Sequence, residues 1–102
     1  MDKIRLKKWD VTEHLDNEEI IAAYLADAFE NGNGEEIKQA LADVAKAKNM
    51  TEIANNMGIS RQGLYKMLSE KGNPEFKTVK SMLDALGVKF SIIPKSENRI
   101  SK

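Results

Sequence analysis

The stretch from residue 51 to residue 68, TEIANNMGISRQGLYKML, constrains the fold of this chain more than any other. Apolar residues recur at helical spacing on both sides of Gly58, which predicts two short amphipathic helices. Glycine tolerates the left-handed backbone that closes a helix, so Gly58 is expected to end the first one. The apolar side chain of Ile59 is then expected to pack inside the turn. The fold must therefore accommodate a tight junction between two short helices.

Residues suited to helix capping precede both predicted helices. Thr51 is expected to cap the first helix and Ser60 the second, because a hydroxyl oxygen can accept a hydrogen bond from an unpaired backbone N–H. Leu64, Met67 and Leu68 give the second helix a buried stripe. Its outer side then carries Arg61, Gln62, Tyr65 and Lys66. This layout is typical of a helix-turn-helix, whose second helix enters the DNA major groove. A plain helical hairpin is the alternative.

Charge is distributed unevenly, although the formal net charge of the 102 residues is zero. Residues 1–43 contain five basic and eleven acidic side chains, whereas residues 44–82 contain seven basic and three acidic ones. Attraction to phosphate depends on the local field at the docking face rather than on total charge. The basic excess around the two short helices therefore favours contact with nucleic acid. The alternative is that these charges only solvate helix faces.

Composition argues against several other classes of function. The chain has no cysteine, which excludes disulfides and thiolate metal sites. The lone histidine, His14, belongs to no nucleophile–base pair and to no metal-spaced cluster. No apolar run approaches the ~18 residues that a membrane-spanning helix needs. We therefore expect a cytoplasmic protein that is not an enzyme, with no metal, no cofactor and no membrane contact.

Two longer helices are predicted before the central stretch. Asp16, with Glu19 three residues later, has the pattern of a capping box, and that helix is expected to end at Asn31-Gly32. Asn33 and Glu36 repeat the pattern at the start of the next helix, which leads into the central stretch.

The C-terminal part combines a helix with a strand-like segment. A last helix is predicted from about residue 75 to residue 86, with Gly87 as its stop. Its buried stripe is expected to be Phe76, Val79, Met82, Leu83 and Leu86. Residues 88–94 then alternate like a short β-strand that Pro94 ends. A lone strand has two unpaired edges, so it needs either the N-terminal arm, residues 1–15, or the same strand of a second subunit.

Several short segments of this chain recur together in one protein family. The most specific are Leu64-Tyr65 in the second short helix and Gly72-Asn73-Pro74 in the loop after it. The others are Tyr24-Leu25, Ala40-Leu41, Asp43-Val44-Ala45, Gly58-Ile59-Ser60-Arg61, Leu68, Phe76, Thr78-Val79 and Ala85-Leu86-Gly87. With these segments, about residues 10 to 93 resemble the Xre/Cro-type addiction-module antidote proteins, the HigA-like antitoxins of type II toxin–antitoxin systems.

The resemblance implies an all-α, lambda-repressor-like five-helix DNA-binding domain with a short C-terminal β-strand. On this reading residues 1–102 form a single domain: an arm or strand at 1–15, a helical core at 16–87, the strand at 88–94 and a tail at 95–102. The resemblance further implies a homodimer that binds operator DNA, represses its own operon and neutralises a RelE/HigB-like toxin. A stand-alone prophage-type regulator without a toxin partner is the alternative.

Particular residues are assigned to the expected DNA contact. Arg61, Gln62 and Lys66 are expected at base edges, because Arg and Lys pair with guanine and Gln with adenine. Tyr65 either stacks at the groove, bonds a phosphate or packs on its own helix. The residues expected to position the protein on phosphates are Thr51, Ser60, Lys71 and Asn73. In a dimer the two recognition helices would lie about one DNA turn, ~34 Å, apart.

Two charged features bear on these partners. Glu52 stands where many relatives carry a phosphate-contacting glutamine, so either that contact is lost or Glu52 pairs with a neighbouring cation such as Lys48. The acidic stretch from Asp10 to Glu36 suits docking to a basic toxin, since opposite potentials orient association. The alternative is that these acidic residues only cap helices and aid solubility.

Overall fold

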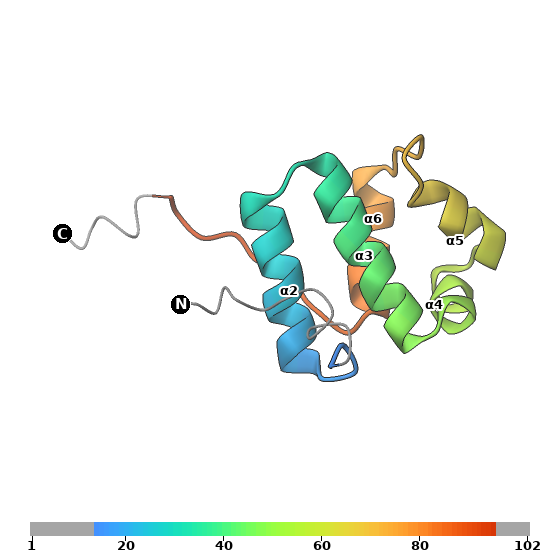
Figure 1. Cartoon of the computed structure of the whole chain (residues 1–102), viewed down its shortest axis with the longest axis horizontal. Helices are drawn as coiled ribbons and strands as arrows, with labels where there is room; N and C mark the ends of the chain where they lie inside the picture. Colours follow the sequence, from blue (N-terminus) through green and yellow to red (C-terminus); the bar gives the residue numbers. More distant parts are fainter. Residues whose placement is uncertain (1–13, 96–102) are drawn as a thin grey trace.

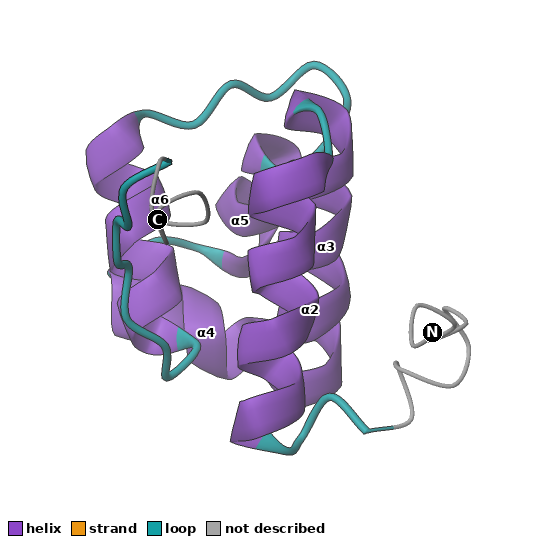
Figure 2. Cartoon of the chain, turned by 90° about the vertical axis from the view of Figure 1, so that its left-hand side faces the viewer, coloured by secondary structure: helices purple, strands orange, loops and turns teal. Residues whose placement is uncertain are grey.

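The computed structural model describes residues 14–95, and within this range the chain is all-helical (Figures 1 and 2). The five helices described within residues 14–95 are α2 (Glu18–Asn31), α3 (Gly34–Lys48), α4 (Met50–Met57), α5 (Arg61–Met67) and α6 (Phe76–Ala85). The predicted all-α class and the number of core helices are confirmed for this range. The finer, lambda-repressor-like arrangement stays a prediction. Residues 1–13 of the predicted arm and residues 96–102 of the predicted tail lie outside the described range.

The predicted cap of α3 is confirmed, whereas the predicted cap of α2 is wrong. Asn33 and Glu36 form the predicted capping box, with each backbone N–H donating to the other side chain at 2.9 Å. Asp16, however, is not the cap of α2. The extended backbone of Asn17 brings its side chain beneath the first turn, where it accepts a hydrogen bond from Glu19 N–H at 2.9 Å. The short connection after Asn31 makes α2 and α3 adjacent helices, which both views show side by side.

The junction of α4 with α5 forms as predicted. Gly58 ends α4 in the left-handed region at φ 75°, and its N–H donates to Asn55 O at 3.0 Å. Ser60 caps α5, because its Oγ accepts a hydrogen bond from Gly63 N–H at 2.9 Å. Ile59 lies between them, partly buried against the core.

The start of α4 differs from the prediction. Thr51 lies inside the helix and is not its cap. Only Asn49 separates α3 from α4, and it ends the first helix and begins the second. Its N–H donates to Ala45 O at 2.8 Å, while its Oδ1 accepts a hydrogen bond from Glu52 N–H at 3.0 Å. Serving both helices holds Asn49 at φ 131°, a conformation that non-glycine residues rarely adopt.

The buried side chains form one cluster around α4, which packs on α3, α5 and α6. Its members are Leu15, Ile21, Leu25, Ala40, Leu41, Val44, Ala45, Met50, Ile53, Ala54, Leu64, Leu68, Met82, Leu83 and Leu86. Phe76 was predicted to belong to it, but this prediction was wrong: the side chain is 64% exposed. Phe76 is the first residue of α6, and its ring contacts Phe90 instead, with centroids 6.0 Å apart.

Residues 88–94 do not form a strand in the described chain. Val88 N–H still donates to Leu83 O at 3.0 Å, and the Phe90 ring packs edge-on against Phe29 at 5.9 Å. No second strand is present among residues 14–95 to complete a ladder, which explains the difference. Figure 1 shows this segment passing α2 and leaving at the end of the molecule remote from α4 and α5.

Candidate nucleic-acid interface

Helix α5 lies at one end of the molecule beside α4, on the right of Figure 1. Leu64 is fully buried and Met67 partly buried, which fixes the inner face of the helix. The outer side chains are exposed, as the helical spacing predicted: Arg61, Gln62, Tyr65 and Lys66. This end of the molecule therefore presents two cations, an amide and a phenol to solvent from one short helix.

A shallow hollow lies along one side of α5, where it meets the junction of α3 with α4. Its lining comprises Lys46, Asn49, Met50, Thr51, Arg61 and Tyr65. The guanidinium carbon of Arg61 lies 5.3 Å from the centroid of the Tyr65 ring, within cation–π range. This contact orients both side chains at the edge of the hollow.

A second hollow lies on the other side of α5, against the loop that follows it. Its lining comprises Gly63, Lys66, Met67, Ser69, Lys71, Gly72 and Asn73. A Cβ at Gly63 would lie 3.0 Å from Ser60 Oγ, so the glycine leaves room for the cap. Lys66 and Lys71 supply positive charge from the helix and from the loop, which suits this hollow to an anion such as a phosphate.

The loop beyond α5 is tied to α3 by Lys38, a residue to which the sequence analysis assigned no role. Lys38 is only 8% exposed, and its Nζ donates to the carbonyl oxygens of Ser69 (2.9 Å), Glu70 (3.1 Å) and Gly72 (2.8 Å). An ion pair with Glu35 at 3.2 Å balances its charge. A signal was present in the sequence: Lys38 precedes the buried Leu41 by three residues, which places it on the inner face of α3.

Six of the eight predicted contact residues line the two hollows beside α5. The first hollow is lined by Thr51, Arg61 and Tyr65, and the second by Lys66, Lys71 and Asn73. Gln62 is exposed but lines neither hollow, and Ser60 uses its oxygen as the cap of α5 while its own O–H remains a donor. Lys46 was not predicted, although its place in the basic last turn of α3 was a usable signal.

The suggested pairing of Glu52 with Lys48 is not observed. Both residues border one hollow, but no ion pair joins them in the described part of the chain. Instead, the backbone N–H of Glu52 donates a hydrogen bond to Asn49 Oδ1. The Glu52 carboxylate stays exposed in the first turn of α4.

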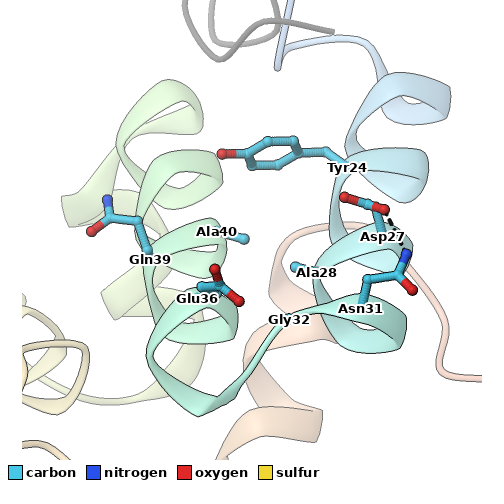
Figure 3. A pocket seen from close by; sticks show the side chains of 8 residues that line it. All are labelled: Tyr24, Asp27, Ala28, Asn31, Gly32, Glu36, Gln39 and Ala40. Atoms are coloured by element: carbon cyan, nitrogen blue, oxygen red, sulfur yellow. Dashed lines mark hydrogen bonds between the residues drawn. The ribbon is translucent and has the colours of Figure 1, made fainter. Parts of the chain in front are cut away.

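A third hollow, between α2 and α3, differs in charge from the two beside α5 (Figure 3). Ala28 and Ala40 face each other across it, and the acidic side chains at its edge are Asp27 and Glu36. Asp27 accepts a hydrogen bond from Asn31 Nδ2 at 2.8 Å, and Glu36 belongs to the capping box of α3. These two carboxylates thus combine negative charge with a local structural role.

Tyr24 of α2 joins the same two helices through a hydrogen bond to Asp43 of α3. Its O–H donates to Asp43 Oδ2 at 2.5 Å, and Gln39 Nε2 donates to the other carboxylate oxygen at 3.0 Å. Burial of the phenol and the neighbouring Asp43 carboxylate both raise the pKa of Tyr24. The hydroxyl is therefore held protonated as a hydrogen-bond donor between α2 and α3.

Within residues 14–95, no helix combines the length and apolar character needed to cross a membrane. The same residues contain no group of three or more His, Cys, Asp or Glu side chains suited to a metal ion.

Comparison with known proteins places this chain in a family. Residues 5–94 match the family model described as "Probable addiction module antidote protein". An uncharacterized protein of Haemophilus influenzae is 49% identical over 88 residues, which cover 86% of this chain and 91% of that protein. No solved structure shows significant similarity to the chain. Since the family model spans most of the sequence, the chain belongs to the addiction-module antidote protein family.

Proposed function

We propose that this protein is a sequence-specific DNA-binding repressor that acts as the antitoxin of a type II toxin–antitoxin module. Membership of an antidote family supports the antitoxin role. The observation that carries the DNA-binding role is the position of α5, which exposes Arg61, Gln62 and Lys66 between two hollows that contain further cations. A recognition helix needs this combination, because base edges specify a sequence and phosphates fix the register.

In the proposed complex α5 lies in the major groove. Arg61 and Lys66 read guanine and Gln62 reads adenine, since these side chains match the donors and acceptors of those bases. Tyr65, braced by Arg61, packs at the edge of the groove. A homodimer places two copies of α5 about one DNA turn, ~34 Å, apart on a near-palindrome.

The two hollows beside α5 receive the flanking phosphates. Lys46 and Thr51 serve one strand from the first hollow, and Lys71 and Asn73 serve the other from the second. Ser60 adds the O–H that capping leaves available. These contacts position the helix without reading sequence.

The toxin-neutralising role is assigned to the opposite charge on α2 and α3. The hollow of Figure 3, with Asp27 and Glu36 at its edge, offers a negative surface to a basic RelE/HigB-like toxin. Opposite potentials accelerate and orient such association. The competing function, a stand-alone regulator without a toxin, needs only the DNA-binding end of the molecule.

The test begins with co-expression of the chain and the product of the adjacent gene. Co-purification supports the antitoxin role, whereas operator binding without any co-purifying product favours the stand-alone regulator. Footprinting of the chain alone and of the complex then locates the operator. Binding that is insensitive to salt would contradict the DNA-binding role, because phosphate contacts release counterions.

Two substitutions separate base reading from phosphate contact. Arg61→Ala should weaken discrimination between operator and random DNA by about 1–3 kcal/mol. Lys71→Ala should weaken binding to all sequences evenly and reduce the salt slope by about 1. Lys80→Ala, on α6 and outside both hollows, is the matched control and should leave binding unchanged. Equal loss on operator and random DNA for Arg61→Ala would contradict base reading.

A further inference from the structure

Exposed apolar side chains gather where the chain leaves the helical core. Of the five large hydrophobic residues exposed within residues 14–95, three belong to the segment 88–94: Phe90 (44%), Ile92 (85%) and Ile93 (63%). A fourth, Phe76, touches Phe90. Single exposed apolar residues are normal in soluble proteins, but a contiguous group marks an interaction surface.

The backbone of this segment is also unpaired. After the hydrogen bond from Val88 N–H to Leu83 O, no residue from 89 to 94 makes a backbone hydrogen bond within the described range. The sequence VKFSII is rich in β-branched and aromatic residues, which favour strands. An elongated segment with these properties is a ready template for strand pairing.

We propose that residues 88–94 pair with the same segment of a second copy, forming an antiparallel two-stranded ribbon that joins the homodimer. The inference rests on the dimer of the proposed function and identifies its interface. A two-fold axis through an antiparallel pair sets one residue opposite its own copy, and Ser91 is the midpoint of the segment. Ile92 then lies opposite Phe90 of the partner subunit, so the most exposed side chain of the group becomes covered.

Charge favours a second copy over a basic toxin as the occupant. Residues 85–95 contain Lys89 and Lys95 and no acidic residue, so this segment itself offers a basic toxin no electrostatic attraction. In the Ser91-centred register Lys89 lies opposite Ile93, and Lys95 lies opposite Gly87. Like charges therefore do not meet across the ribbon.

The position of the segment makes the interface separable from DNA binding. It leaves the molecule at the end remote from α4 and α5, so the ribbon covers neither hollow of the candidate nucleic-acid interface (Figure 1). Dimerisation can thus be measured on the full chain without DNA or toxin.

The absence of native cysteine allows a direct test by disulfide trapping. Residues directly opposite in an antiparallel pair have Cα atoms about 4.5–5.5 Å apart, within the span of a disulfide. Ser91→Cys should give a disulfide-linked dimer under mild oxidation. Ser81→Cys, an exposed serine of α6, is the matched control and should stay largely monomeric on a non-reducing gel. Equal cross-linking of the two variants, or none at position 91, would overturn the proposal.

A second variant tests the apolar contact. Ile92→Asp should raise the dimer dissociation constant at least about tenfold in sedimentation equilibrium, because each copy then sets a charge against an apolar ring. Ala47→Asp, at an exposed site on α3, should leave the constant unchanged. An unaltered dimer for Ile92→Asp would overturn the ribbon. So would a variant that keeps its dimer but no longer co-purifies with the toxin.

These experiments distinguish a failure of the ribbon from a failure of the proposed function. Cross-linking at Ser91 without operator binding would preserve the ribbon and refute the repressor. Operator binding by a dimer that does not cross-link at position 91 would preserve the repressor and refute the ribbon.

Discussion

The ammonium group of Lys38 lies 2.8 Å from the carbonyl oxygen of Gly72, 34 positions further along the chain. Ser69 O and Glu70 O lie within 3.1 Å of the same nitrogen. Carbonyl groups just beyond a helix lack intrahelical partners and attract a cation. One buried lysine of α3 thereby fixes the loop that presents Lys71 beside α5.

Replacing Lys38 by methionine should lower the free energy of unfolding by about 1–3 kcal/mol. The variant keeps the aliphatic stem but removes the donor to the carbonyl groups of Glu70 and Gly72, whereas Ser69 O still accepts a hydrogen bond from Gly72 N–H. Urea denaturation followed by circular dichroism measures the difference. Lys46→Met, at an exposed position of the same helix, should change stability by no more than about 0.5 kcal/mol. Similar values for both variants would contradict the anchoring role.

Gly72 should tolerate no side chain. A Cβ there would lie 2.1 Å from the carbonyl oxygen of Met67, so Gly72→Ala must displace the loop. We expect a loss of about 1–3 kcal/mol in thermal or urea unfolding. Gly34→Ala is the matched control, because a Cβ at Gly34 meets nothing within 4 Å and the residue begins α3. It should raise stability by about 0.4–1 kcal/mol, and a loss there would contradict this account.

Features encoded by neighbouring residues were predictable from the sequence. The capping box of Asn33 with Glu36, the left-handed Gly58 and the Ser60 cap each depend on residues within three or four positions. They fix where α3 and α5 begin and where α4 ends, and the exposed face of α5 follows from Leu64 at its centre. Most of the candidate site was therefore predictable as a set of residues on one surface.

The remaining features depend on distant parts of the chain or on a second chain. The carbonyl partners of Lys38 lie 31 to 34 positions away. The sequence therefore could predict its place on the inner face of α3 but not its partners. Asn49 is an exception, because its partners Ala45 and Glu52 are local. It was missed because one residue ends α3 and begins α4, whereas the prediction assigned a separate cap to α4. Residues 88–94 have strand character but no partner strand within the described chain.

The reassigned cap of α4 gives a direct comparison. Asn49→Ala should lower stability by about 1–2 kcal/mol, because it removes the acceptor of Glu52 N–H and keeps the strained φ of 131°. Asn49→Gly should lower stability by less than Asn49→Ala does, since glycine adopts positive φ readily. Thr51→Ala should change the unfolding midpoint little, because Thr51 is exposed and caps nothing. A larger loss for Thr51→Ala than for Asn49→Ala would restore the original assignment.

Tyr24 should make the fold sensitive to alkali. Burial and the Asp43 carboxylate raise the pKa of Tyr24 in the folded chain above its ordinary value of 10.0, so the folded state retains this proton more strongly than the unfolded state. The resulting stabilisation is fully present below pH 10 and is lost as the pH rises from there through the folded pKa.

Tyr24→Phe removes this titration while Gln39 remains a donor to Asp43. Urea unfolding at intervals from about pH 8 to pH 11.5 should therefore show a constant difference between the two proteins up to about pH 9. Above about pH 10 the native chain should lose up to about 1.4 kcal/mol per pH unit more than the variant. Parallel curves across the whole range would show that Tyr24 titrates alike in the folded and unfolded states, and the hydrogen bond to Asp43 would then contribute nothing to the alkaline limit of the fold.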